Sequence, residues 1–427
     1  MKGIKKVKIG EVCSIRRGAS PRPINNFLID TPGIPWLKIS DASSDDCVKI
    51  KETKQFITNE GKDKSVYLEK GSLVLSNSGT PCIPKIIDLD LCIHDGWLTF
   101  SDFNGIDKAY LYYIFKYHRK HILAQGNGSI FKNLKTDILK EYEIYLPDLL
   151  TQKKIADLLS SLDDKIEINN KINAELEELG QALYTKWFVN YDFPNEEGKP
   201  YKSSGGEMIE SELGMIPKGW KVDNILSIFN FEKGVEPGSN NYTNNKDDIR
   251  FIRVKDMETT SPDVYVSEDT MGTKKLKYIS SKDIVISLDG TIGKVFVGNE
   301  GCISSGIGII KLKDYEYMID YTYLFAKSNY LINSLTGGSS GSVIKHAGGR
   351  LNDLKIVHPN TDTLLKFQNS YNGIVEMIIQ NRIENKKLEE LRDFLIPQLM
   401  SGNLEIKDIE GKLKQQLPCN INKNEMV

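Results

Sequence analysis

The stretch NNKINAELEELGQALY at residues 169–184 returns in altered form as NRIENKKLEELRDFLI at residues 381–396. The longer segments that follow Pro147 and Pro359 align without a gap at a constant offset of 212 residues. The aligned identities are Pro147/Pro359, Lys154/Lys366, Ile166/Ile378, Asn169/Asn381, Asn173/Asn385, Leu176/Leu388, Glu177/Glu389, Glu178/Glu390, Leu179/Leu391 and Leu183/Leu395. A constant period of this size indicates that the chain is internally duplicated.

The regions upstream of these segments resemble each other more loosely. WLKISDAS at 36–43 resembles FIRVKDMET at 251–259, and KGSLVLSNSGT at 70–80 resembles KDIVISLDGT at 282–291. Short alternating runs such as SLVLS and IVISL, broken by Gly, Asn, Ser and Pro, are typical of strands joined by loops. The sequence therefore predicts an α+β chain in the order globular part, helix, globular part, helix.

The repeated segments also carry a seven-residue pattern with one Asn in each copy. Its members are Ile155, Leu162, Asn169, Leu176 and Leu183, and then Phe367, Ile374, Asn381, Leu388 and Leu395. Such a series predicts a coiled-coil seam in which a buried Asn sets the register at some cost in stability. Two separate amphipathic core helices are the alternative interpretation.

Composition places the chain among ordinary globular proteins. It has 427 residues, a net charge of −2, 40% apolar and 27% charged residues, so two or three domains are expected and collagen-like, disordered and membrane classes are excluded. The N-terminus lacks the apolar stretch of a signal peptide, and the six cysteines show no C-x-x-C spacing. We expect a cytoplasmic protein with reduced thiols and no membrane segment.

Charge is unevenly distributed along the chain. Residues 1–145 carry 22 Lys and Arg against 17 Asp and Glu, whereas residues 201–357 carry 19 against 20. The basic first part is compatible with a polyanionic partner, but the second part could contact DNA only through local clusters.

Both halves of the chain contain polar loops that include glycine and lie beside basic residues. Gly allows close backbone approach to a ligand, while Ser, Asn, Lys and Arg supply contacts to phosphates and base edges. Hairpin turns with solvated charges are the alternative for any single residue. The DNA-binding candidates are Arg16, Arg17, Lys38, Ser76, Asn77, Ser78, Thr80, Lys132, Asn133, Lys135, Arg253, Lys255, Ser287, Asp289, Thr291, Lys294, Lys345 and Arg350.

Catalytic signatures are missing from the sequence. It contains no G-x-x-x-x-G-K-[ST] phosphate loop, no Gly-rich dinucleotide fingerprint and no Asp/Asn-Pro-Pro-aromatic tetrapeptide of the kind found in amino-methyltransferases. We therefore predict no catalytic residue, no metal site and no cofactor bound by this chain.

The repeated helical segments resemble those of the specificity (S) subunits of type I restriction–modification systems. The resemblance is carried by Leu146-Pro147 through Gln152–Ala156, by LSSLDDKIEINNKINAELEELGQALYTKWFVNYDFP at 159–194 and by LEELRDFLIPQLMSGNLEI at 388–406. It implies two target recognition domains separated by two long helices packed as an antiparallel coiled coil, in a pseudo-twofold arrangement. The resemblance also implies that each recognition domain reads one half of a split sequence in double-stranded DNA.

The same resemblance implies the domain layout and the partners. The expected layout is recognition domain 1 at 1–146, helical spacer 1 at 147–194, a linker of polar composition at 195–214, recognition domain 2 at 215–357, helical spacer 2 at 358–411 and a polar tail at 412–427. Two methyltransferase subunits and motor-nuclease subunits are the implied partners, and S-adenosylmethionine, ATP and magnesium belong to them. A catalytic fusion and a coiled-coil scaffold without nucleic acid are the competing interpretations.

Overall fold

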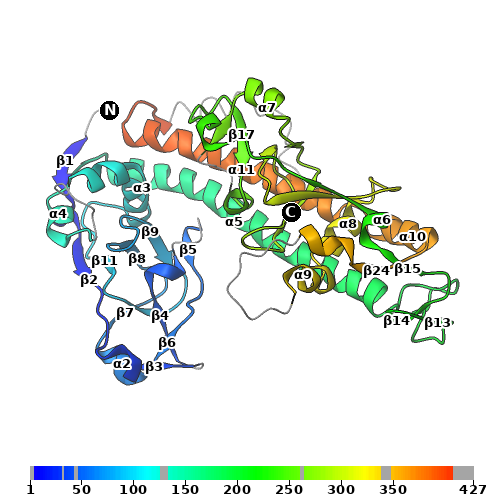
Figure 1. Ribbon diagram of the computed structural model, residues 1–427. Helices are drawn as coiled ribbons and strands as arrows, with labels where there is room; N and C mark the ends of the chain where they lie inside the picture. Colours follow the sequence, from blue (N-terminus) through cyan, green and yellow to red (C-terminus); the bar gives the residue numbers. More distant parts are fainter. Residues whose placement is uncertain are drawn as a thin grey trace, which may run out of the picture. The chain divides into compact units, whose positions relative to one another are not determined.

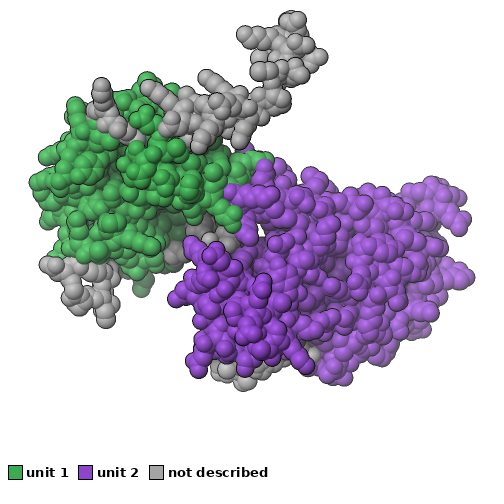
Figure 2. Space-filling view, turned by 90° about the horizontal axis from the view of Figure 1, so that it is seen from above, with its two compact units in different colours: residues 1–167, 388–427 green, residues 168–387 purple. Residues whose placement is uncertain are grey.

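The computed structural model describes residues 4–30, 33–42, 47–125, 133–259, 264–337 and 348–406, and it mixes helices with sheets (Figure 1). Lys132 and Lys345, two of the expected DNA-binding residues, lie outside the described residues. The chain divides into two compact units (Figure 2). Unit 1 comprises residues 1–167 and 388–427, and unit 2 comprises residues 168–387. The division falls inside both long helices, α5 (Leu149–Tyr184) and α11 (Ile374–Met400), so each unit contains part of each helix.

Unit 1 is built from short strands and helices that precede α5. They are β1 (Lys5–Lys8), α1 (Ile9–Val12), β2 (Ser14–Arg17), β3 (Leu28–Ile29), β4 (Ile34–Leu37), β5 (Lys49–Ile50), β6 (Phe56–Ile57), α2 (Asn59–Asp63), β7 (Val66–Leu68), β8 (Leu73–Ser76), β9 (Pro84–Ile87), β10 (Leu91–Ile93), β11 (Trp97–Ser101), α3 (Lys108–Ala124), α4 (Thr136–Lys140) and β12 (Glu143–Leu146).

Unit 2 contains the corresponding series. Its elements are β13 (Met208–Ser211), β14 (Gly214–Pro217), β15 (Lys221–Asn224), α6 (Ile225–Ile228), β16 (Phe229–Lys233), β17 (Ile249–Ile252), β18 (Tyr265–Val266), α7 (Glu268–Lys274), β19 (Tyr278–Ile279), β20 (Ile284–Ser287), β21 (Val295–Phe296), β22 (Gly301–Ile303), β23 (Ile307–Leu312), α8 (Ile319–Ala326), α9 (Asn329–Thr336), β24 (Lys355–His358) and α10 (Thr361–Tyr371).

The two units share one strand topology. The sheet β2-β11-β8-β9-β5 of unit 1 corresponds to β16-β23-β20-β21 of unit 2, and β3-β6-β4-β10-β7 corresponds to β18-β17-β22-β19. Both units have an equivalent parallel pair, β4–β10 or β17–β22, among antiparallel neighbours, and unit 1 has a second parallel pair, β5–β9. The pairs β1–β12 and β15–β24 close each unit just before its long helix. The duplication expected from the helices therefore extends through the α+β globular parts.

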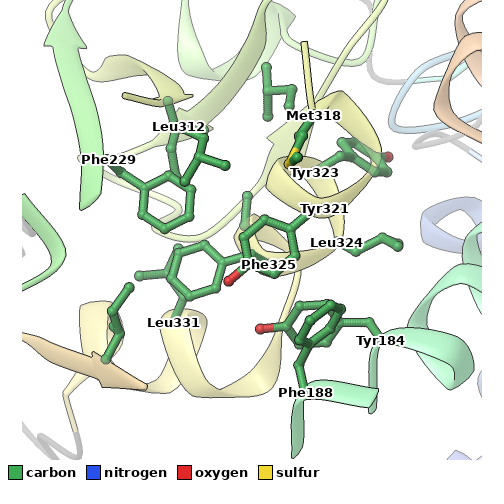
Figure 3. Packing of buried hydrophobic residues seen from close by; sticks show 14 of the residues in the cluster. Tyr184, Phe188, Phe229, Leu312, Met318, Tyr321, Tyr323, Leu324, Phe325 and Leu331 are labelled. Carbon is green, nitrogen blue, oxygen red and sulfur yellow. The ribbon is translucent and has the colours of Figure 1, made fainter. Parts of the chain in front are cut away.

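Each unit has its own apolar core. In unit 1, the buried face of α3 packs with strand residues Leu75 and Leu98 and with Leu395 and Leu399 of α11. In unit 2, aromatic rings dominate: Phe229 and Phe325 stack with ring centroids 4.5 Å apart, and Tyr184 and Phe188 join the same cluster (Figure 3). Buried rings of this size contribute large apolar areas, so the ends of the long helices are anchored in the unit cores.

The two helical segments begin with the same cap. The Asp148 carboxylate accepts hydrogen bonds from the Thr151 N–H and hydroxyl, and the Asn360 Oδ1 atom accepts the same two bonds from Thr363. In each copy the cap follows a proline, Pro147 or Pro359. Side-chain oxygens at this position satisfy N–H groups that have no partner within a helix.

The second helical segment, expected as helical spacer 2 at 358–411, is divided into two helices. Helix α10 ends at Tyr371, and α11 begins after Gly373, whose φ of +102° is accessible to glycine. The buried Asp320 carboxylate accepts hydrogen bonds from the Gly373 and Val375 N–H groups and thereby caps the new helix. Since Phe367 and Ile374 lie on different helices, the expected seven-residue seam is interrupted there.

Seam residues differ in burial. Ile155, Asn169, Phe367 and Leu395 are buried, whereas Leu162, Leu176, Leu183, Ile374, Asn381 and Leu388 are half-buried. Within unit 2, Asn169 donates to Asn385 at 2.9 Å, and Asn381 donates to Asn173 at 2.8 Å. Asn173 follows Asn169 in α5, but its partner Asn381 precedes Asn385 in α11. The two helices therefore run antiparallel in this unit.

The segment expected to be a linker is folded. Asn195 accepts backbone hydrogen bonds from Glu197 and Lys199, and Ser203 bonds to Asp192. Residues 208–217 form the hairpin β13–β14. The polar composition of this segment reflects turns and not a flexible linker. Asn, Gly and Ser are common in tight turns as well as in flexible segments.

Equivalent glycines, Gly18 and Gly234, follow β2 and β16. At each glycine the backbone at the end of another strand, β10 or β22, approaches closely. A Cβ atom at Gly18 would lie 2.2 Å from the His94 carbonyl oxygen, and one at Gly234 would lie 2.3 Å from the carbonyl oxygens of Ile303 and Ser304. The Gly18 N–H donates to Trp97 at 2.8 Å, so the strand cannot move away without losing this bond.

We expect Gly18→Ala and Gly234→Ala each to lower the free energy of unfolding by roughly 2 kcal/mol, because the methyl group overlaps backbone atoms that cannot rotate away. Gly272→Ala is the control, since nothing lies within 4 Å of a Cβ atom at this position in α7. Denaturant unfolding of the full chain measures all three. Equal stability of the three variants would contradict the close approach.

Candidate nucleic-acid interface

The same serine-centred turn follows β8 in unit 1 and β20 in unit 2. The Ser76 hydroxyl donates to the Thr80 carbonyl at 2.7 Å and accepts from the Ile83 N–H at 2.8 Å. The Ser287 hydroxyl donates to the Thr291 carbonyl and accepts from the Lys294 N–H at 2.9 Å. Gly79 and Gly290 adopt φ values of +66° and +68° within these turns. The loops that resemble each other in sequence are therefore one structural motif used twice.

This geometry corrects part of the expected site. Ser76, Asn77 and Ser287 are 1%, 2% and 0% exposed, so they do not present their side chains to a DNA duplex in this structure. Both serine hydroxyls hold the backbone of their own turn. The residues of the motif that are accessible are Ser78, Thr80, Asp289 and Thr291, which lie at its tip.

Unit 1 gathers its candidates at one edge, where strands of its two five-stranded sheets end. Arg17 at the end of β2 pairs in register with Leu98 of β11, and Trp97 pairs with Ser76 of β8. The other described candidates, Arg16, Lys38, Asn133 and Lys135, are connected to this edge through their own strands or loops. Arg16 precedes Arg17 on β2, Lys38 follows β4 beside the turn after β10, Asn133 forms a bridge with Ser78, and Lys135 comes two residues later.

Unit 2 gathers the equivalent positions, but its cations are engaged internally. Arg253 makes a two-point contact with the buried Asp256, with one nitrogen–oxygen distance of 2.5 Å. Lys294 pairs with Glu258, and Arg350 donates to the Leu335 carbonyl at 2.6 Å. Lys255 is exposed on the short helical turn Val254–Asp256. DNA would have to compete with protein groups for the three engaged side chains.

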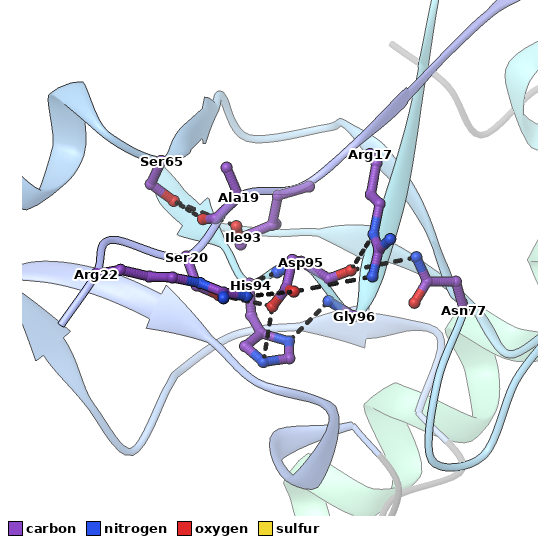
Figure 4. A network of polar contacts seen from close by, with 10 residues as sticks. All are labelled: Arg17, Ala19, Ser20, Arg22, Ser65, Asn77, Ile93, His94, Asp95 and Gly96. Carbon is purple, nitrogen blue, oxygen red and sulfur yellow. Dashed lines mark hydrogen bonds and ion pairs between the residues drawn. The ribbon is translucent and has the colours of Figure 1, made fainter. Parts of the chain in front are cut away.

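A polar cluster that sequence reasoning missed lies at the edge of unit 1 (Figure 4). We call it the Asp95 cluster, and its members are Arg17, Ser20, Arg22, His94 and Asp95. Arg17 donates to the Asp95 carbonyl at 2.7 Å, Ser20 donates to the carboxylate at 2.7 Å, and the guanidinium groups of Arg17 and Arg22 each lie 3.8 Å from that carboxylate. Two arginines face one carboxylate, so the cluster is net positive.

The His94 ring in this cluster is neutral near pH 7. Burial lowers the pKa of His94 below its ordinary value of 6.5, and Lys38 and Arg17 lower it further, whereas Asp95 raises it. Its Nδ1 atom accepts from the Gly96 N–H at 2.8 Å, and its Nε2 atom lies 3.1 Å from the Asp95 carboxylate. The Nε2-protonated tautomer satisfies both contacts.

Unit 2 has a contact equivalent to the one between Ser20 and Asp95, but the carboxylate and the hydroxyl have changed places. There Glu236 occupies the place of Ser20, and Ser305 occupies the place of Asp95. The Ser305 N–H and hydroxyl donate to Glu236 at 3.1 and 3.3 Å. The carboxylate thus sits on the other segment, and Lys233 stands where unit 1 has Arg17. The two edges share a backbone frame but differ in charge.

The family described as "Type I restriction modification DNA specificity domain" matches residues 1–178 and 217–393. The chain belongs to the family of type I restriction–modification specificity subunits.

Relatives of this S subunit extend over most of its length. It is 26% identical to the type I restriction enzyme MjaIX specificity subunit of Methanocaldococcus jannaschii, with 95% of this chain and 94% of the relative aligned. It is 24% identical to the HindI specificity subunit of Haemophilus influenzae, with 66% and 73% aligned. The crystal structure of an S subunit from M. genitalium matches 93% of this chain and 96% of its own at a TM-score of 0.52 and 15% identity, which supports the fold.

A sequence signal for the Asp95 cluster does exist in this S subunit. Ile93-His94-Asp95-Gly96 and Ile303-Ser304-Ser305-Gly306 share an Ile-x-x-Gly frame, and Gly18 and Gly234 each follow two charged residues. These frames mark the equivalent turns. Among the described residues no group of three or more His, Cys, Asp or Glu side chains could hold a metal ion, and no helix is long and apolar enough to cross a membrane.

We expect Ser76→Ala and Ser287→Ala each to cost about 1–3 kcal/mol of stability, because each leaves a buried N–H and a carbonyl of the turn without its partner. Thr80→Ala and Thr291→Ala are matched controls in the same turns, since their exposed side chains can be removed while the carbonyls remain. Thermal unfolding of the full chain distinguishes the pairs. A serine variant as stable as its threonine control would refute the structural role.

Acidification should destabilise unit 1 through His94. The folded state holds the pKa of His94 below 6.5, so the unfolded state binds the proton first, and stability falls as the pH is lowered through about 6.5. His94→Asn keeps an acceptor near the Gly96 N–H but does not titrate, so it should flatten this part of the stability curve. Denaturant midpoints between pH 7.5 and 5 measure the effect. Parallel curves for the two proteins would exclude His94 as the source.

Proposed function

We propose that this chain is the DNA-recognition subunit of a type I restriction–modification complex, and that each unit reads one half of a split DNA target. The observation that carries the proposal is the duplicated sheet edge. In both units the same serine-centred turn, the same close-approach glycine and a set of basic residues come together. Family membership supplies the biological setting for this arrangement.

The chemistry of the edge suits duplex DNA. Arginine and lysine side chains neutralise phosphates, and accessible Ser, Thr, Asn and Asp side chains at turn tips can exchange hydrogen bonds with base edges. The net-positive Asp95 cluster makes unit 1 the stronger electrostatic contact. Unit 2 depends on releasing Arg253, Lys294 and Arg350 from their protein partners, so its contribution is less sensitive to salt.

We propose further that two methyltransferase subunits and motor-nuclease subunits associate with this chain, and that the α5 and α11 helices contribute the surfaces for them. Catalysis belongs to these partners, together with S-adenosylmethionine, ATP and magnesium. This chain contributes recognition alone and acts in the cytoplasm. The exposed apolar side chains on α5 and α11, among them Ile168, Leu179, Met377 and Phe394, are available to such partners.

Exchanging residues 215–357 for the equivalent segment of a relative with a different target should change one half of the methylated motif. The other half should persist, because the edge of unit 1 is left intact. Sequencing of methylated bases in cells that express the chain with its methyltransferase subunits measures the result. Exchange of residues 1–146 is the reciprocal control.

A change in both halves after a single exchange would contradict the assignment of one half-site to each unit. Unchanged methylation after both exchanges would contradict the DNA-reading function itself.

A further inference from the structure

Two charge pairs with largely covered side chains join α5 to α11, one in each unit. In unit 1, Arg392 Nη1 lies 2.6 Å from Asp163 Oδ1, and the two side chains are only 12% and 5% exposed. In unit 2, Arg382 Nη2 lies 3.1 Å from Glu177 Oε1, with 18% and 23% exposed. The acid is on α5 and the arginine on α11 in both units.

A tyrosine completes each pair. Tyr113 of α3 donates to Asp163 at 2.6 Å, and Tyr323 of α8 donates to Glu177 at 2.6 Å. In unit 2, Lys327 also bonds to Glu177, and Arg382 donates to the Val297 carbonyl at 2.8 Å. Burial raises the pKa of Glu177, but the hydrogen bonds from Lys327 and Tyr323 and the charges of Lys327 and Arg382 lower it overall. Glu177 is therefore held as a charged group within packed surroundings.

The asparagines between the helices follow a different rule. Asn169 contacts Asn385, and Asn381 contacts Asn173. Asn169 and Asn381 occupy equivalent places in the duplicated segments, as do Asn173 and Asn385. The asparagine contacts would consequently be the same if one repeat helix paired with a second copy of itself, so they specify register but not partner.

The charge pairs do depend on the partner. At the offset of 212 residues, Gly180 is equivalent to Arg392, and Asn170 is equivalent to Arg382. In the same register, two copies of α5 would place Asp163 opposite Gly180 and Glu177 opposite Asn170, and neither acid would meet an arginine. Two copies of α11 would place Arg392 opposite Val375, the equivalent of Asp163, and so without an acid, whereas Arg382 would still face an acid in Glu389, the equivalent of Glu177. An unpaired buried charge is strongly unfavourable, which excludes a wrong partner more effectively than apolar contacts can.

We propose that the acids of α5 and the arginines of α11 form a pairing code that restricts each long helix to the helix of the other repeat. The duplication makes the helices similar enough for a second copy of this chain to compete at the seam. The code rejects pairing of like repeats, while the asparagines keep the register common to both.

Complementary full-length chains test the code. One carries Asp163→Arg and Glu177→Arg, so that both helices bear arginines, and the other carries Arg382→Glu and Arg392→Asp, so that both bear acids. Each chain alone should lose at least about 5 °C in Tm or become insoluble. Co-expressed with different tags, they should form a one-to-one heterodimer with recovered Tm, because each α5 then matches the α11 of the other chain. Reversing the exposed pair Lys171 and Glu175 is the control and should change neither property.

Single chains that stay monomeric with the Tm of the unmodified protein would overturn the proposal, as would soluble chains that fail to associate when mixed during expression. If both chains remain insoluble together, the reversed pair Asp163→Arg with Arg392→Asp in one chain decides the matter. Recovery of more than half of the Tm lost in the single variants supports the code, and no recovery refutes it.

Discussion

The buried contact between α5 and α11 is the constraint on which the rest of the structure depends. Each compact unit takes its core partly from one end of both helices, as with Leu395 and Leu399 in unit 1 and Tyr184 and Phe188 in unit 2. Unit 1 is therefore completed by two separate stretches of chain, whereas unit 2 is the single stretch 168–387. Polar groups bond across this contact: asparagines bond between the helices, and each acid meets an arginine and a tyrosine. Desolvated polar groups of this kind stabilise little by themselves but penalise alternatives heavily.

The helices and the α+β class could be predicted from the sequence because periodicity is a local property. A seven-residue pattern is visible within a few turns of chain. The division at Gly373 could not be predicted in the same way, since the group that caps the new helix, Asp320, is 53 residues away in sequence. Likewise, the turns at 195–214 have the composition of a tether, and only their bonds to Asp192 and Asn195 show that the segment is folded.

The candidate site was only partly predictable for a related reason. The repeated motif after β8 and β20 was evident, but the pattern could not say which polar groups face solvent. Serine serves a turn or a ligand with the same hydroxyl, and in both units the turn uses it. The Asp95 cluster escaped detection because it joins residues 17–22 with residues 94–95, and this proximity arises from pairing of β2 with β11. Lys132 and Lys345, outside the described residues, stay predictions.

Duplication followed by divergence explains why the two edges share geometry but not charge. Substitutions at the serines that close the turns, or at Gly18 and Gly234, disturb the backbone frame, whereas the groups on that frame can change as long as each buried donor keeps an acceptor. The exchange of Ser20 and Asp95 for Glu236 and Ser305 satisfies this condition with the carboxylate moved to the opposite segment. If the two units are to recognise different half-sites, they need a common backbone frame and an edge whose charges can differ between the units. The helices face the opposite demand, because the acids of α5 must match the arginines of α11, and the repeat stays visible there in the leucines and asparagines that both copies share.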